Sequence, residues 1–321
     1  MRSSNPRLHI GNYEGALRNW VELQNQDYEM FSMVADLHSL TTMAEDAHEV
    51  GRNSREIAKD FIAGGIDPAK SPIFIQSHVK EHFELHLLFS MITPLGWLER
   101  TPTYKEKQQD IGGAEREPYG LLGYPVLQTA DILLYKPYGV PVGRDQAPHL
   151  EIGNDIGQRF NRIYGREVFP AYKYLIPEDE TRAKVPGLDM RKMSKSYDNC
   201  IYLSSTEDEV AAMVKKAFTT PSKIKMTDPG IPEGCAVCQY LKLYSPDWQT
   251  QWEEDREGKR GCSQNKRELT ECLNEFLRPM RERRAQLDDA TIEDILRDGA
   301  ARAREVAAAT MAEVREAMGL G

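Results

Sequence analysis

The sequence has few cysteines, no long apolar run and no excess of positive charge. Five cysteines occur among 321 residues, and an odd number in a chain without a secretory signal does not suggest a disulfide framework. No run reaches 18 apolar residues, and residues 1–7 include no apolar stretch of signal-peptide length. We therefore expect a soluble, cytoplasmic protein with one large core and a smaller domain.

The acidic balance limits the nucleic acids that the chain can bind. A formal net charge of −9 argues against indiscriminate binding, because phosphate contacts need clustered lysine and arginine. An RNA partner would have to meet a local basic face. One candidate is a helical stretch with four arginines, Arg278, Arg281, Arg283 and Arg284. A solvated helical face is the alternative.

Residues 186–197 are too polar and too rich in turn formers for a packed helix or strand, so we expect a mobile loop. Its centre reads Lys192, Met193, Ser194, Lys195 and Ser196. Both lysines can turn toward one polyanion, and the serines add hydroxyl donors. Such a cation pair stabilises charge that develops on a leaving group. A solvated basic loop is the ordinary alternative, so the interpretation needs a partner elsewhere.

That partner is the tetrapeptide His9, Ile10, Gly11 and Asn12. Apolar residues follow it at helical spacing, which places it at a helix N-terminus, where unpaired N–H groups and the dipole favour anions. His9 can donate to a phosphate, and Gly11, without a Cβ, lets adenine lie against the backbone. Asn12 supplies an amide donor or a cap. A capping or surface histidine is the alternative for His9.

The tetrapeptide and the loop together resemble the two hallmarks of the class I aminoacyl-tRNA synthetases, His-hydrophobic-Gly-His and Lys-Met-Ser-Lys-Ser. The loop is unaltered, and Asn12 replaces the second histidine. In this family a strand and a Gly-x-x-Pro-Ser/Thr-Gly turn precede the tetrapeptide. That turn is not legible in residues 3–6, so we assign no ATP contact there. We expect that the first strand is missing from the numbered chain or that the true start lies upstream.

The fold expected is α/β. Strands at residues 31–36 and 72–76 alternate with a helix over 55–63 that ends at Gly64. This alternation predicts a parallel sheet with helices on both faces and ligands beyond the carboxyl ends of the strands. His38 lies at such an end; a site role and a plain structural role are equally compatible with the sequence, and the resemblance favours the site.

The resemblance also implies the domain organisation. We expect a Rossmann-like catalytic domain over residues 1–197, with a connective insertion near 100–140. A helical anticodon-binding domain over 198–300 and a C-terminal helix over 301–321, packed back on the catalytic domain, should follow. Thr206 and Glu209 form a capping box that opens the first helix of the second domain.

Asp131 is a lone carboxylate in a largely apolar, helix-compatible run at residues 124–135. Burying an unpaired charge costs on the order of several kcal/mol, so Asp131 needs a donor. Lys136 or an arginine of the next helix could supply it; so could an indole N–H that arrives with a substrate. The run resembles the tryptophanyl branch of the family. There the matching aspartate reads the indole nitrogen, and a tyrosine at the position of Tyr124 helps to hold the amino acid.

Further site residues rest on the same resemblance. Nucleotide contacts are expected from Gly143, Arg144, Asp145 and Val185, and Gln146 is expected to bind the substrate's α-amino group. Lys107 matches a lysine that reaches the ATP phosphates in this family. The alternative is a solvated lysine without a site role, which is the more common case for such a residue. Tyrosyl enzymes typically read Gly-Gly-Ser-Asp-Gln where this chain has Pro141, Val142 and Gly143, which argues against tyrosine. Outside the family context, an Asp-Gln pair before a helix is most often a cap.

The cysteines suggest no metal centre. Some tryptophanyl enzymes hold an iron–sulfur cluster through four cysteines, but only Cys235 and Cys262 match those positions; Asp255 and Asn265 stand at the others. A four-thiolate cluster is therefore not expected. Cys238 lies three residues after Cys235, a spacing that alone is weak evidence for metal, and reduced structural thiols are expected.

The resemblance, which covers residues 7–319, implies an enzyme that activates L-tryptophan with ATP and Mg²⁺ and transfers it to tRNA(Trp), as a homodimer. His9, Lys107, Lys192 and Lys195 would stabilise charge during in-line attack on ATP, without a side-chain nucleophile. No editing domain is expected. The alternatives are a tyrosine-activating relative and a non-catalytic paralogue that binds RNA or protein.

Overall fold

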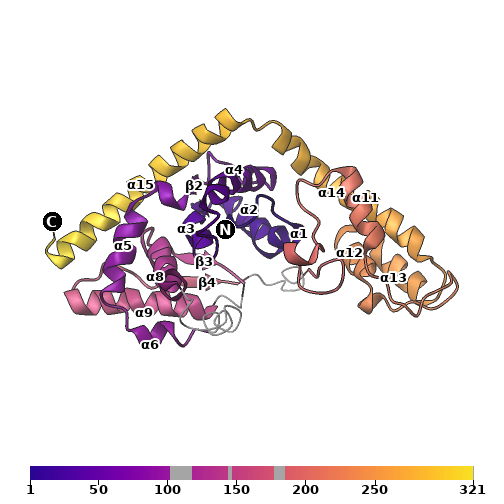
Figure 1. Ribbon diagram of the computed structural model, residues 1–321, viewed down its shortest axis with the longest axis horizontal. Helices are drawn as coiled ribbons and strands as arrows, with labels where there is room; N and C mark the ends of the chain where they lie inside the picture. The colour runs from indigo at the N-terminus through magenta and orange to yellow at the C-terminus, as the bar shows by residue number, and fades with distance from the viewer. Residues whose placement is uncertain (102–117, 144–146, 177–184, 321) are drawn as a thin grey trace.

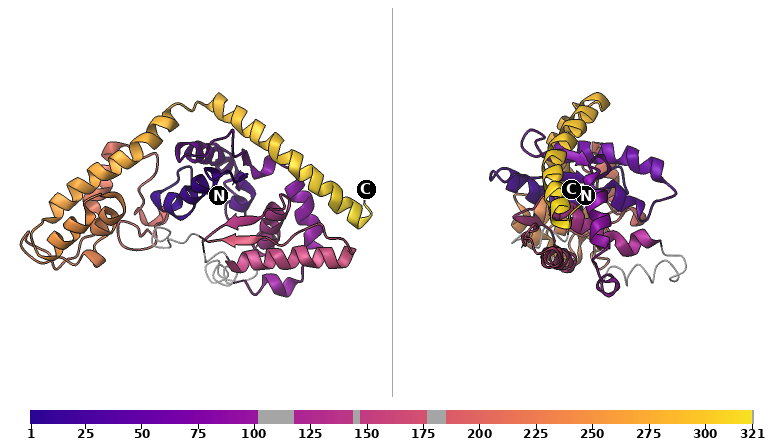
Figure 2. Two further views of the ribbon diagram at one scale, coloured as in Figure 1. Left: turned by 180° about the vertical axis from the view of Figure 1, so that it is seen from behind. Right: turned by 90° about the vertical axis from the view of Figure 1, so that its left-hand side faces the viewer.

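A computed structural model describes residues 1–101, 118–143, 147–176 and 185–320. The molecule is an elongated arch, with the strand-containing part at one end and a helical part at the other (Figure 1). Two long helices, α14 (Cys262–Ala285) and α15 (Asp289–Met318), form its upper edge. The view from behind shows them meeting at the apex (Figure 2).

Two pairs of short parallel strands lie in the first part of the chain. β1 (Ser32–Val34) pairs with β2 (Ile73–Ile75), with Met33 opposite Phe74. β3 (Gly139–Pro141) pairs with β4 (Lys173–Leu175). Both pairs are parallel, as strand–helix alternation predicts, because a parallel connection needs a crossover. The predicted α/β class with a helical C-terminal part is confirmed.

Helices flank these strands and follow the apolar periodicity of the sequence. Val50, Ile57 and Phe61 are buried on one face of α4, which ends before Gly64 as expected. The elements of this part are α1 (Ile10–Asn12), η1 (Tyr13–Leu17), α2 (Arg18–Gln24), α3 (Asp36–Leu40), α4 (Ala47–Ala63), η2 (Gln76–His78), α5 (Glu81–Ser90), α6 (Leu95–Leu98), α8 (Tyr119–Leu133) and α9 (Ala147–Tyr164).

Residues 1–3 lie beside β1, where the first strand was expected to be missing. Arg2 forms a parallel bridge with Ala35. The Ala35 amide donates to the carbonyl of Met1 at 2.8 Å, and the Ser3 amide donates to Ser39 Oγ at 2.8 Å. This short extended segment therefore supplies the next parallel neighbour of β1.

The second part contains η5 (Lys195–Tyr197), α11 (Glu207–Lys216), η6 (Pro232–Gly234), α12 (Ala236–Tyr244), α13 (Trp248–Arg256) and α14. The predicted capping box is confirmed: Thr206 Oγ1 accepts from the Glu209 amide, and the Glu209 carboxylate accepts from the Thr206 amide. Leu269, Leu273 and Leu277 recur every four residues along α14 and are fully buried. This stripe packs α14 against α11, α12 and α4.

α15 runs back along the strand-containing part and packs against β2, α5 and α4. It begins at Asp289, after an Asp288 cap, and ends at Gly319 in the left-handed conformation. The domain boundary that we placed between residues 300 and 301 falls inside this helix, because its apolar face continues unbroken from Ile292 to Val314. None of the helices in the described ranges combines the length and apolar composition that a membrane crossing requires.

Gly299 allows α15 to approach β2, and its substitution tests this contact. A Cβ at Gly299 would lie 2.0 Å from the carbonyl oxygen of Ile73, so helix and strand would have to separate. We expect Gly299→Ala to lower the free energy of unfolding by about 1–3 kcal/mol, as overpacking does. Urea denaturation measures this change.

Gly51→Ala is the matched control. Gly51 is also inside a helix, but a Cβ there would meet nothing within 4 Å. Alanine should stabilise that position by roughly 0.5–1 kcal/mol. Equal stabilisation by both substitutions would contradict the close approach of α15 to β2.

Candidate active site

The front tetrapeptide is joined to the chain segment that follows the lysine loop. The amide of Ile10 donates to the carbonyl of Ile201 at 2.9 Å, and the amide of Leu203 donates to the carbonyl of Leu8 at 2.8 Å. Between them His9 and Tyr202 form an antiparallel bridge. Segments almost 200 residues apart in the sequence thus become neighbours.

The lysine loop itself touches the tetrapeptide. The amide of Gly11 points at Met193 Sδ, 3.4 Å away. A Cβ on Gly11 would lie 3.1 Å from His9 Nδ1 and 3.2 Å from Met193 Sδ, so only glycine fits without displacing them. Met193 is buried, whereas Lys192 and Lys195 are exposed. The loop therefore anchors through its methionine and presents its lysines outward.

Asn199 fixes the base of this loop. Its Oδ1 accepts from the Ser194 amide at 2.8 Å, and its Nδ2 donates to Asp189 Oδ1 at 2.8 Å and to the Lys192 carbonyl at 3.1 Å. The Gly187 amide also donates to the Arg191 carbonyl at 2.7 Å. The loop that we expected is thus a hydrogen-bonded turn, and Val185 is buried at its start.

His9 is the N-cap of α1 and forms a capping box with Asn12. His9 Nδ1 accepts from the Asn12 amide at 3.2 Å, and Asn12 Oδ1 accepts from the His9 amide at 3.1 Å. Burial lowers the pKa of His9 to about 4, so the ring is neutral at pH 7. Because Nδ1 accepts, the proton lies on Nε2, where it can donate to a phosphate oxygen.

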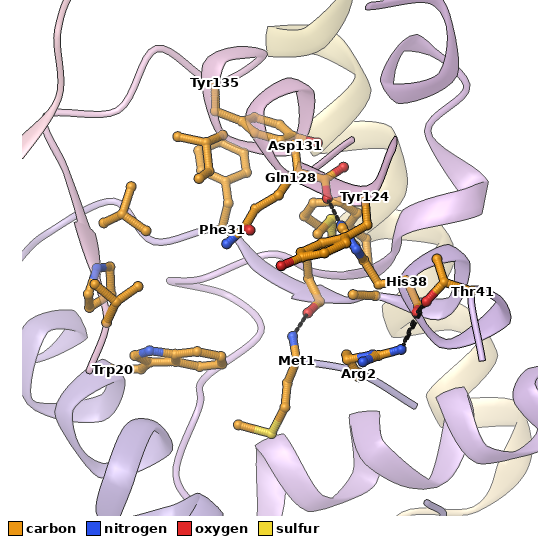
Figure 3. A pocket seen from close by; sticks show the side chains of 17 residues that line it. Met1, Arg2, Trp20, Phe31, His38, Thr41, Tyr124, Gln128, Asp131 and Tyr135 are labelled. Carbon is orange, nitrogen blue, oxygen red and sulfur yellow. Dashed lines mark hydrogen bonds and ion pairs between the residues drawn. The ribbon is translucent and has the colours of Figure 1, made fainter. Parts of the chain in front are cut away.

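A cavity of about 550 Å³ opens beside β1 and α8 (Figure 3). Its wall is largely aromatic, with a few polar groups. Asp131, Gln128 and Tyr135 lie together on one side, and Trp20 lies across from them. Rings and polar groups in its lining include Trp20, Phe31, Phe74, Tyr124, Tyr135, His38, Gln128 and Asp131. A pocket of this kind suits a flat aromatic ligand with one polar edge.

Asp131 is the acidic group of this cavity, and its side chain is 5% exposed. Gln76 Nε2 donates to both carboxylate oxygens at 2.7 and 2.8 Å. His38 Nε2 lies 2.8 Å from Oδ2, and His82 Nδ1 lies 2.7 Å from Oδ1. Burial alone would raise the pKa of Asp131, but hydrogen bonds from the two histidines and their charge lower it to about 2. The group is therefore a permanent anion.

The partners of Asp131 differ from those that the sequence suggested. Lys136 pairs with Glu313 at 2.6 Å, and histidine and glutamine side chains take the place of a lysine or arginine. Gln76 directly follows the carboxyl end of β2, so the rule that selected His38 could have found it. His82, inside α5, carries no such signal.

Two more cavity residues occupy defined positions. The Tyr124 hydroxyl lies 3.3 Å from His149 Nε2, and its ring meets His38 edge to face at 6.4 Å. Arg2, which we did not predict, also lines the cavity and donates to the His38 carbonyl at 2.5 Å and to Thr41 Oγ1 at 3.1 Å. Its guanidinium supplies a positive charge to the same wall.

Some predicted site residues cannot be placed. Lys107, Arg144, Asp145 and Gln146 lie outside the described residues, as does the side chain of Ser196. Gly143 follows β3, whose Val140 and Pro141 line the cavity. The nucleotide contacts assigned to these residues stay predictions.

The RNA contact expected from the arginine face stays a prediction, and three of its arginines also make contacts within the protein. Arg283 Nε donates to the Ala63 carbonyl at 2.8 Å, and Arg284 Nε lies 3.1 Å from the fully buried Asp60. Arg281 donates to the carbonyl of Asn274 at 2.9 Å. Arg278, which pairs with Glu275, and Arg283 are exposed, whereas Arg281 and Arg284 are partly buried. Arg284 turns inward because the end of α14 packs on α4, where its guanidinium pairs with Glu56 and Asp60.

The parallel strands and the contact between tetrapeptide and lysine loop define a class I synthetase. In agreement, the family model described as tRNA synthetases class I (W and Y) matches residues 1–278. The tryptophan–tRNA ligase of Aquifex aeolicus is 41% identical, over 98% of this chain and 97% of that protein. The one of Thermotoga maritima is 43% identical, over 98% and 96%.

A solved structure shows the same architecture over the whole length. Tryptophanyl-tRNA synthetase from Campylobacter jejuni, complexed with ADP and tryptophan, superposes with a TM-score of 0.89 at 35% identity and covers 100% of this chain and 98% of that one. The chain therefore belongs to the tryptophanyl-tRNA synthetase family.

The lowered pKa of His9 predicts a pH dependence of stability. A free imidazole has a pKa near 6.5, whereas folded His9 titrates at about 4. Between these values the unfolded chain binds more protons, so this histidine makes the native state lose stability as the pH falls from about 6.5 to 4. His9→Asn keeps a capping side chain but cannot titrate.

We therefore expect the urea midpoint of the wild type to fall more steeply between pH 7 and pH 4 than that of His9→Asn. His78→Asn, which removes an exposed histidine, should retain the wild-type slope. Identical slopes for wild type and His9→Asn would show that His9 does not titrate differently on folding.

Proposed function

We propose that this chain is a tryptophan–tRNA ligase that activates L-tryptophan with ATP and transfers it to tRNA(Trp). The observation that supports this best is the anionic Asp131 in the wall of an aromatic cavity. A carboxylate without a proton only accepts hydrogen bonds, and an indole N–H only donates them. The two relatives described above are named tryptophan–tRNA ligases, and the Campylobacter protein holds tryptophan and ADP.

The proposed reaction needs positioning and charge rather than a side-chain nucleophile. The tryptophan carboxylate attacks the α-phosphorus of ATP, and pyrophosphate leaves. His9 donates through Nε2 to a phosphate, while Lys192, Lys195 and Lys107 stabilise the charge on the leaving group. Gly11, Asn12, Gly143, Arg144, Asp145, Val185, Met193, Ser194 and Ser196 complete the proposed ATP site. Tyr124, His38 and Gln146 hold the amino acid beside Asp131.

Mg²⁺ is proposed to arrive with the nucleotide. Within the described ranges no group of three or more His, Cys, Asp or Glu side chains could hold a metal ion, and Mg²⁺ is commonly bound through substrate phosphates.

The use of ATP and tRNA as substrates supports a cytoplasmic location. The tRNA contact itself we assign to the helical part as a whole.

An iron–sulfur cluster does not fit the residues around Cys235 and Cys238. Asp255 Oδ1 lies 3.2 Å from the Lys223 ammonium and accepts from Asn265 Nδ2 at 3.0 Å. An ammonium and an amide thus take up the space in which a cluster would need thiolates. This buried ion pair replaces a metal as the polar centre of the helical part.

Tryptophan-dependent exchange between ATP and pyrophosphate tests the activity. Wild type should exchange with tryptophan and not with tyrosine, whereas a non-catalytic paralogue would give no exchange.

Asp131→Asn should raise KM for tryptophan by roughly ten- to a hundred-fold, because the amide presents an N–H as well as an oxygen to the indole. Lys195→Ala should instead lower kcat and leave that KM nearly unchanged. An unaltered KM in Asp131→Asn would remove this residue from the pocket.

We also propose a homodimer that forms through an apolar surface on α5 and α6. Phe83, Leu87, Met91 and Leu95 recur every four residues and are 39%, 55%, 69% and 57% exposed. A contiguous apolar stripe of this kind is typical of an interface rather than of free surface. A second copy of the chain is its proposed occupant.

The double substitution Leu87→Glu and Met91→Glu should halve the mass measured by sedimentation, because four buried charges across the two-fold axis repel. Ile224→Glu, at an apolar position that is 87% exposed elsewhere, should leave the mass at the wild-type value. A dimer that survives the double substitution would place the interface on another surface.

A further inference from the structure

His82 lies behind the cavity and contacts two of the residues that line it. Its side chain is fully buried and is not part of the cavity lining. Nδ1 is 2.7 Å from Asp131 Oδ1, and Nε2 is 2.9 Å from the Tyr135 hydroxyl. One ring thus connects the acidic group of the pocket to part of its aromatic wall.

The protonation states of the three groups follow from their surroundings. Burial, then the negative charges of Asp131 and Glu81, raise the pKa of Tyr135 well above its ordinary value, so the phenol keeps its proton, and its oxygen shares a hydrogen bond with His82 Nε2. The Asp131 anion only accepts hydrogen bonds, so His82 carries a proton on Nδ1, the nitrogen that lies 2.7 Å from Oδ1. Tyr135, His82 and Asp131 thus form a chain of contacts between buried polar groups.

His82 also belongs to the aromatic packing of the cavity wall. Its ring lies parallel to Phe74, with centroids 6.2 Å apart. Tyr135 in turn stacks on Phe31 at 4.7 Å and meets Phe74 at 5.9 Å. Phe31, Phe74 and Tyr135 all line the cavity. A change at His82 therefore affects both the orientation of the acceptor and the slot for a flat ring.

We propose that His82 is a positioning residue for amino-acid specificity, one that fixes the Asp131 carboxylate so that the pocket demands an N–H on the bound ring. This inference rests on the proposed function of the site. Gln76 and His38 contact the carboxylate as well, but they approach from the strand ends of β1 and β2. His82 alone, among the described partners, couples the carboxylate to Tyr135.

When the Asp131 carboxylate is held in place, an amino acid whose ring has no N–H loses binding free energy. 3-Benzothienyl-alanine has the size and shape of tryptophan but carries sulfur in place of the indole N–H. In a rigid pocket it leaves a desolvated acceptor site of the carboxylate unpaired, and such sites reject the analogue strongly. A carboxylate that can turn toward Gln76 and His38 regains partners, so discrimination against the analogue falls.

Three variants separate the two contacts of the ring. His82→Asn retains a donor near the position of Nδ1 and loses the link to Tyr135. His82→Gln retains an acceptor near the position of Nε2 and loses the contact with Asp131. His82→Leu removes both. Tyr135→Phe removes the hydroxyl while the stacking ring remains, and exposed His78 supplies the control His78→Gln.

The measurement is kcat/KM for ATP–pyrophosphate exchange with tryptophan and with 3-benzothienyl-alanine. Their ratio in the wild type defines the discrimination. We expect His82→Leu and His82→Gln to reduce this ratio by roughly ten- to a hundred-fold, mainly through KM for tryptophan, with KM for ATP within about two-fold of the wild type. His82→Asn should restore most of the ratio, and His78→Gln should not change it.

A purely structural role predicts a different result. Partial unfolding would lower kcat/KM for both amino acids equally and would leave their ratio at the wild-type value in every soluble variant; this outcome overturns the proposal. Should His82→Leu fail to fold, His82→Gln still decides between the two, because it also loses the contact with Asp131. A wild type without tryptophan-dependent exchange would overturn the proposed function instead, so the two failures are distinguishable.

Discussion

The site depends on one antiparallel contact between Leu8–Ile10 and Ile201–Leu203. Its two backbone hydrogen bonds are made where Leu8, Ile10, Ile201 and Leu203 are at most 3% exposed, so breaking them would leave buried amides and carbonyls without partners. The contact places Gly11 against Met193 and directs both motifs to one side of the chain. The helix start at His9 and the loop that carries the two lysines become neighbours through it.

The buried carboxylate of Asp60 stabilises this contact through a hydrogen bond to its backbone. Asp60, fully buried in α4, accepts from the Leu8 amide at 2.7 Å and lies 3.1 Å from Arg284 of α14. Burial raises the pKa of Asp60 to about 6, against the opposing effect of Arg284. Leu8, which precedes the tetrapeptide, and Arg284 of the helical part thus share one acid of α4, which explains why Arg284 turns inward.

Asp131 is a second buried carboxylate, and unlike Asp60 it has a lowered pKa. Burial would neutralise an isolated carboxyl group, yet donors from three elements keep this one ionised. Because Gln76, His38 and His82 come from η2, α3 and α5, the acceptor in the pocket has a fixed place relative to the strands. The position of this acceptor is therefore set by three elements of the scaffold.

The sequence by itself determined the features that depend on local chemistry. Turn and cap residues, apolar periodicity and strand–helix alternation identified the lysine loop, the helix start at His9, the box at Thr206 and the parallel strands, because each reflects the dihedral preferences of a few neighbouring residues. Only the tertiary structure decided which side chains pair with each buried carboxylate. Gln76 and His82 gather around Asp131, Arg284 reaches Asp60, and residues 1–3 take a place beside β1, since these pairings depend on which distant segments pack together and not on any local pattern.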